Sequence, residues 1–157
     1  MLRLILGLWM VVMGWFPLST DAQPAAYTFD QLDSLQQASE RNVVVFIHTD
    51  WCKFCQTMKN TTLQNQEVES LLNENFWFIS LNAEYRGDII LAGRTFSFKP
   101  TGAGTGVHEL AEELGRQQGE LSYPSLCILD SDLQILFQYD QLMSVRQMKE
   151  VLEGIKE

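Results

Sequence analysis

The chain has 157 residues, of which 11 are Lys or Arg and 20 are Asp or Glu, so its net charge at pH 7 is −9. This length suits one domain, and the acidic balance makes nucleic acid and anionic membrane surfaces poor binding candidates. Three cysteines, at positions 52, 55 and 127, are too few for a small domain held together by a disulfide framework.

The N-terminus is typical of a secretory signal peptide. One positive charge precedes an uncharged apolar run over residues 4–18, which is shorter than the roughly 20 residues of a membrane span. Small residues follow, and we expect cleavage after Ala22. The prediction is therefore a signal peptide over residues 1–22 and one domain over residues 23–157, located in the periplasm or secreted. An uncleaved N-terminal anchor is the alternative.

The first half of the expected domain alternates helical and strand patterns. Asp30 is the expected cap of the first helix and Asn65 that of the third, because both are good acceptors for free amide groups. The run "VVVFIH" has the length and composition of a strand buried on both faces. Helices are predicted over 28–42, from Cys52 onward and over 65–75, and strands over 43–48 and 76–82.

Residues 83–106 are irregular in composition and are expected to form an insertion, with a short hairpin around 94–98. The stretch "TGAGTGV" lacks the glycine spacing of a dinucleotide loop and predicts a flexible loop instead. A helix over 107–117, two strands over 122–130 and 133–140, and a helix over 145–157 capped by Ser144 follow. Helices alternating with buried strands predict an α/β fold with a mixed β-sheet flanked by helices.

The stretch "HTDWCKFCQTM", residues 48–58, contains two cysteines that could exchange electrons, bind a metal or staple a loop. A buried strand leading into a helix at Cys52 favours thiol chemistry, because free amides and the helix dipole stabilise a thiolate there. Cys55 lies one turn further and is placed to resolve a mixed disulfide. Lys53 adds positive charge beside Cys52, or is an ordinary surface residue.

This motif carries a family resemblance. "DWCKFC" after a buried strand, with "YP" before a later strand, resembles the thioredoxin superfamily over nearly all of residues 28–157. Within it the chain looks most like secreted thioredoxin-like proteins and the C-terminal domain of the bacterial transmembrane thiol:disulfide interchange protein. That closer likeness includes the two cysteines and the residues Asp50, Trp51, Met58, Thr62, Leu63 and Val68.

The resemblance implies a thioredoxin fold in which the insertion at 83–106 precedes the cis-Pro strand. It implies Cys52 and Cys55 as the catalytic dithiol, with no metal or cofactor. It also implies a cis bond between Tyr123 and Pro124, in a loop that lies beside Cys52 and pairs with the substrate backbone. The expected surroundings of the dithiol are Trp51, which would shield it, and Lys53, Phe54, Tyr123, Pro124 and His48.

Three departures from the family pattern bear on the mechanism. Phe46 stands where thioredoxin has a buried aspartate, and Ser80 falls near the position of its partner lysine. Lys-Phe replaces the usual Gly-Pro between the cysteines. Proton transfer from Cys55 must therefore use water or another group, for which His48 and Glu84 are candidates.

Three further residues have two readings each. His48 either tunes Cys52, since histidine titrates near neutrality, or packs under the active-site helix. His108, expected on the helix after the insertion, is either a hydrogen-bonded structural residue or a residue near the Cys-Pro site. Cys127 is predicted to be a buried free thiol acting as a small hydrophobe, with a third redox cysteine as the alternative.

The resulting hypothesis is an extracytoplasmic thiol:disulfide oxidoreductase that mainly reduces disulfide-containing protein substrates and is re-reduced by a membrane-borne electron donor. A disulfide oxidase or isomerase is one alternative. A copper-binding module that uses Cys52, Cys55, Met58 and His48 is another, and a non-catalytic protein with a structural disulfide is the last. Residues 83–106 are the expected site of partner specificity.

Overall fold

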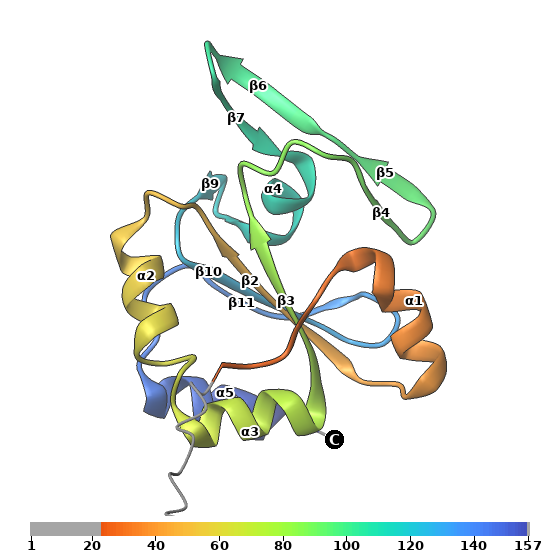
Figure 1. The fold of residues 1–157 in the computed structure, drawn as a ribbon, viewed down its shortest axis with the longest axis vertical. Coiled ribbons are helices and arrows are strands. Elements are labelled where there is room, and N and C mark those ends of the chain that lie inside the picture. Colours follow the sequence, from red (N-terminus) through yellow and green to blue (C-terminus); the bar gives the residue numbers. More distant parts are fainter. Residues whose placement is uncertain (1–22, 157) are drawn as a thin grey trace, which may run out of the picture.

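The computed structural model describes residues 23–156 (Figure 1). The predicted signal peptide lies outside the described residues. Within residues 23–156 no helix is both long and apolar enough to cross a bilayer.

The centre of the fold is a five-stranded mixed sheet in the order β1-β3-β2-β10-β11. Strands β1 (Ala26–Tyr27), β3 (Phe76–Asn82) and β2 (Asn42–His48) run parallel to one another. Strand β10 (Ser125–Leu129) is antiparallel to β2 and to β11 (Ile135–Tyr139). The long apolar run of β2 explains its central position, because such a strand can be buried on both faces.

Helices cover both faces of the sheet (Figure 1). The first core lies under α1 (Phe29–Ala38) and α4 (Glu109–Gly115), and the second lies under α2 (Lys53–Asn60), α3 (Gln66–Asn75) and α5 (Val145–Ile155). Alternate residues of β2 contribute to the two cores, as the period of a strand requires. The predicted α/β fold, a mixed sheet flanked by helices, is confirmed.

Two of the three capping residues predicted from the sequence are confirmed. The side chains of Asn65 and Ser144 accept backbone N–H groups at the starts of α3 and α5. For α1 the predicted cap, Asp30, is wrong. Thr28 is the cap, and its N–H donates to the Gln31 side chain at 2.9 Å. Phe29 is buried and already helical, which moves the start of α1 before Asp30.

The segment 83–106 contains two antiparallel hairpins and not the single short hairpin expected around 94–98. The first pairs β4 (Ile89–Leu91) with β5 (Arg94–Phe96), and the second pairs β6 (Phe98–Gly102) with β7 (Thr105–His108). The predicted hairpin around 94–98 therefore spans the junction between two hairpins. "TGAGTGV" forms the turn and return strand of the second one and is no flexible loop.

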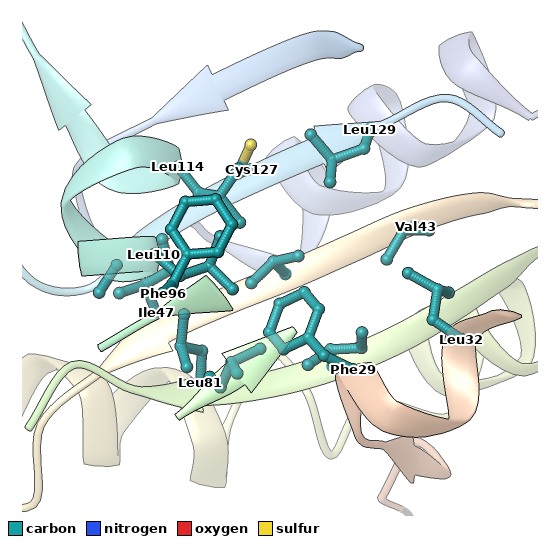
Figure 2. Close-up of a cluster of buried hydrophobic side chains, with 14 of the residues drawn as sticks. Phe29, Leu32, Val43, Ile47, Leu81, Phe96, Leu110, Leu114, Cys127 and Leu129 are labelled. Atoms are coloured by element: carbon teal, nitrogen blue, oxygen red, sulfur yellow. The ribbon is translucent and has the colours of Figure 1, made fainter. Parts of the chain in front are cut away.

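The first hairpin of this insertion is anchored in the first core. Ile89 and Phe96 are buried there, and Figure 2 shows Phe96 beside Leu110 and Leu114 of α4. The turn residues Ala92 and Gly93 both have positive φ, 50° and 74°, as a tight two-residue hairpin needs.

The predicted helix over 107–117 is shorter in the structure. Helix α4 begins after His108, its cap, and ends at Gly115. A small hairpin of β8 (Arg116–Gln117) and β9 (Glu120–Leu121) follows and leads to the Tyr123–Pro124 bond, which is cis.

Candidate active site

Cys52 and Cys55 form a disulfide at the start of α2. The helix starts at the predicted place, and Cys52 is its cap: the Sγ of Cys52 accepts the backbone N–H of Cys55 at 3.1 Å. Cys52 is 5% exposed and Cys55 is completely buried. Cys52 is therefore the more accessible of the two cysteines, while Cys55 is shielded. The donated N–H and the helix dipole would stabilise a thiolate on Cys52 after reduction.

Aromatic side chains border the disulfide. Trp51 and Phe54 are 66% and 64% exposed. The indole N–H of Trp51 donates to Glu84 Oε1 at 3.2 Å, and its ring meets Tyr123 edge-on with centroids 6.0 Å apart. Tyr123 also packs against the core that contains both cysteines. The structure thus brings the loop after β3 and the cis-Pro loop together beside Cys52.

Tyr123 is partly buried and lies near two carboxylates. Burial, followed by the carboxylates of Glu84 and Glu112, raises the pKa of its hydroxyl to about 12. Tyr123 is therefore a neutral phenol at pH 7, and two acidic side chains lie near the cis-Pro loop.

His48 ends β2 and is buried on the α2 side of the sheet. Its Nε2 lies 3.0 Å from Ser80 Oγ, and Lys59 Nζ lies 3.2 Å from each ring nitrogen. The ring stacks on Phe46, with centroids 5.4 Å apart. Burial, followed by the positive charge of Lys59, lowers the pKa of His48 to about 4. Burial also lowers the pKa of Lys59.

This His48–Lys59–Ser80 cluster lies beside the two positions at which the chain departs from thioredoxin. Phe46 and Ser80 are register partners in β2 and β3, and His48 contacts both side chains. Sequence reasoning missed Lys59, because a lysine in the last turn of a short helix resembles a surface residue. The i, i+4 spacing of Cys55 and Lys59 was the available signal, since it places both on one side of the helix.

We predict a pH effect on stability from His48. Because its folded pKa is below the unfolded value of 6.5, the neutral ring stabilises the fold above pH 6.5, and this contribution is lost as the pH falls toward 4. The free energy of unfolding of the natural protein minus that of His48→Asn should fall by about 2 kcal/mol between pH 7 and pH 4.5. Urea denaturation at several pH values measures it. A difference that stays constant with pH would contradict the burial of a neutral His48.

His108 has a structural role. It is fully buried, and its Nδ1 accepts the N–H of Leu110 at 3.2 Å. The ring proton must then be on Nε2, which donates to the carbonyl of Gly87 at 3.1 Å. His108 caps α4 and does not lie within it, contrary to the predicted boundary. Its two bonds tie the start of the insertion to α4.

Cys127 is a free, fully buried thiol, as predicted. It belongs to the first core, whereas Cys52 and Cys55 belong to the second, on the other face of the sheet. Figure 2 shows it among Leu110, Leu114 and Leu129. Burial raises the pKa of Cys127 to about 12. Its position favours the role of a small hydrophobe over that of a third redox cysteine.

The donor set does not suit the copper alternative. That alternative needs His48, but its ring nitrogens face Lys59 and Ser80. Met58 is 1% exposed and packs in the second core.

Comparisons with known proteins agree on the fold. A family model described as thioredoxin-like matches residues 28–131. A search of curated proteins gave no match.

Solved structures share the architecture at low identity. A thioredoxin from Thermus thermophilus is 18% identical, with a TM-score of 0.59, covering 85% of this chain and 87% of that one. The reduced C-terminal domain of DsbD from Neisseria meningitidis is 18% identical, with a TM-score of 0.52, covering 80% and 90%. A putative disulphide-isomerase from Bacteroides thetaiotaomicron is 16% identical, with a TM-score of 0.59, covering 87% and 97%.

Proposed function

The chain belongs to the thioredoxin-like family, and from this premise we propose that it is an extracytoplasmic thiol:disulfide oxidoreductase that mainly reduces protein disulfides. The observation that carries the proposal is the Cys52–Cys55 disulfide at the start of α2, in which Cys52 is slightly exposed and Cys55 is buried. This asymmetry gives the two cysteines different tasks.

In the reduced protein the Cys52 thiolate attacks one sulfur of the partner's disulfide. A mixed disulfide forms, and the other partner sulfur leaves as a thiolate that takes a proton. Cys55 then loses its proton and attacks Cys52 Sγ, which releases the second partner thiol. Two electrons pass to the partner, and the Cys52–Cys55 disulfide is restored. Of the candidate acceptors for the Cys55 proton, water and Glu84 are favoured over His48, because the ring nitrogens of His48 face Lys59 and Ser80.

The cellular location of the protein and the direction of electron transfer rest on different arguments. The signal-peptide pattern of residues 1–22 favours an extracytoplasmic site, where a membrane-borne donor would re-reduce the dithiol. The sequence resemblance to the C-terminal domain of the transmembrane interchange protein favours reduction over oxidation. The insertion at 83–106 is the proposed site of partner specificity.

The equilibrium reduction potential of the Cys52–Cys55 pair tests this proposal. We expect a value near that of thioredoxin, about −270 mV, because a reductase must be easily re-oxidised by its substrates. The protein from residue 23 onward is equilibrated with thiol buffers, and its thiols are alkylated and counted by mass. A value above roughly −180 mV would instead assign it as an oxidase or isomerase.

A further inference from the structure

A positive charge lies between the active-site helix and the end of β2. Lys59 is half-buried in the last turn of α2, four residues after Cys55. Its Nζ lies 3.2 Å from each ring nitrogen of His48, and it forms no ion pair with any described residue. The closest polar contact of this cation is therefore a neutral ring and not a carboxylate.

Three features place the ammonium of Lys59 toward the cysteines. Residues four apart share one face of a helix, and side chains lean toward the N-terminus of their helix, so Lys59 extends toward the turn that contains Cys55. Its Nζ lies 5.8 Å from the centre of the Phe46 ring, which packs in the same core as Cys55. The charge of Asp50, two residues before Cys52, also acts on Lys59.

His48 and Ser80 hold the ammonium in this position. His48 is buried, and its Nε2 lies 3.0 Å from Ser80 Oγ. In the tautomer that donates from Nε2 to Ser80, Nδ1 is free to accept an N–H of Lys59, so the ring nitrogens are both satisfied. Lys59 acts on His48 as a positive charge. The contact thus fixes a cation on the face of α2 that carries Cys55 without neutralising it.

Cys55 depends on its surroundings to become a nucleophile. It is completely buried, and burial in an apolar core disfavours a thiolate. The aspartate that thioredoxin has nearby is replaced by Phe46. A nearby cation has the opposite effect to burial, because it stabilises the charged form of a thiol. Lys59 therefore supplies the kind of charge that the resolving step requires.

The other charged groups around the dithiol do not replace Lys59. Lys53 and Asp50 are both exposed and opposite in sign, so water and salt screen their charges more than that of a half-buried group. Glu84 accepts the indole N–H of Trp51, and its carboxylate disfavours a thiolate nearby.

We propose that Lys59, held by His48, stabilises the thiolate of Cys55 and thereby speeds the attack of Cys55 on Cys52 Sγ. The proton of Cys55 passes to water or Glu84, as before. The thiolate of Cys55 supplies the electron pair of the new S–S bond, and the partner sulfur leaves as a thiolate that takes a proton. Lys59 is thus a positioning residue for a charge and touches neither the partner nor the proton. This inference rests on the proposed function and adds a residue to its resolving step.

The pH dependence of the resolving step tests the inference. The reduced natural protein is mixed in a stopped-flow instrument with an aromatic disulfide whose thiolate is coloured. Colour is released first when Cys52 attacks the reagent, and again when Cys55 displaces the remaining aromatic thiolate from Cys52. The rate constant of the second release is measured from about pH 6.5 to pH 10, a range above the titration of His48. Cys127 is buried and should not react.

Lys59→Met is the diagnostic variant, because methionine keeps much of the apolar stem and removes the charge. It should raise the midpoint of the second release by about one pH unit. At pH 7 the rate constant should fall only about threefold, because a more basic thiolate is a better nucleophile and this offsets part of the tenfold loss of thiolate. Lys59→Gln should give the same shift, and Lys59→Arg, which keeps the charge, should leave the midpoint nearly unchanged.

Lys156→Met is the matched control. It removes the same charge at the end of α5, where Ile155 accepts a hydrogen bond from Asn42 at the opposite end of β2 from His48. Its midpoint and rate constants should equal those of the natural protein.

The outcomes separate the inference from the proposed function. If Lys59→Met and Lys59→Gln leave the midpoint unchanged, the inference is wrong and the proposed function stands. If the Met and Arg variants slow the second release equally at every pH, Lys59 has only a structural role, and the inference is also wrong. If the natural protein releases no second thiolate, Cys55 does not resolve the mixed disulfide, and the proposed function itself fails.

Discussion

Replacing Cys52 with serine is expected to lower the rate of disulfide reduction by at least about a thousandfold, because a hydroxyl cannot replace the attacking thiolate. Cys55→Ser should lose turnover to a similar degree, but for a different reason. Its Cys52 can still attack, and the mixed disulfide then has no resolving thiol. Turnover of a disulfide peptide, with dithiothreitol as the electron source, measures the loss of activity in each variant. Intact-mass spectrometry detects the covalent adduct between Cys55→Ser and the peptide.

Cys127→Ala is the matched control, since it removes the one thiol on the opposite face of the sheet. It should retain the turnover of the natural protein. In Cys55→Ser/Cys127→Ala the adduct should still form, which assigns it to Cys52. Equal trapping by Cys52→Ser and Cys55→Ser would contradict the roles given to the two cysteines.

Among the substitutions considered, Phe46→Ala should give the largest loss of stability, about 4 kcal/mol in the free energy of unfolding. Phe46 is fully buried in the core that also contains Cys55 and Met58, and His48 stacks on its ring. Its removal leaves a cavity that the central strand cannot fill by collapsing. Urea denaturation monitored by circular dichroism measures the change.

Phe54→Ala is the natural comparison, because it deletes the same atoms from a side chain that is 64% exposed. It should change the free energy of unfolding by less than about 0.5 kcal/mol. If Phe46→Ala fails to fold, Phe46→Leu should cost less than about 1.5 kcal/mol and keep the comparison measurable. Similar effects of Phe46→Ala and Phe54→Ala would show that the assigned burial is wrong.

The central elements of the fold could be predicted from sequence because their patterns are strong. The run 43–48 is continuously apolar, and such a run fits a strand covered on both faces. Asn65 and Ser144 precede helical patterns and cap them. The placement of Cys52 at a helix start followed from the strand before it and the apolar spacing after it.

The insertion could not be predicted in the same way. Its first hairpin turns at Ala92–Gly93, and the small hairpin after α4 turns at Gln118–Gly119, whose residues also have positive φ. Neither dipeptide is the Asn-Gly or Asp-Gly signal of a two-residue turn. The burial of Ile89 and Phe96 depends on contacts with α1 and α4, which local patterns do not contain.

In the active site, too, features set by neighbouring residues could be predicted and contacts between distant residues could not. The two cysteines and their helix are local features, and the sequence was sufficient for them. The Glu84–Trp51 bond spans 33 residues, and the contact of His48 with Lys59 spans 11. Such contacts are determined by the packing of separate elements. The i, i+4 spacing of Cys55 and Lys59 indicates which side of α2 carries Lys59, but not that His48 is its partner.

The position of Cys127 has a consequence for how the protein would survive in the oxidising compartment that we propose for it. A chain with an odd number of cysteines can become covalently linked to a second copy through the unpaired thiol. Here Leu110 and Leu114 of α4 and Leu129 of β10 pack in the core that encloses that thiol, and burial keeps it protonated. The fold therefore protects this thiol, and Cys127 can form a disulfide with a second copy only after the protein unfolds.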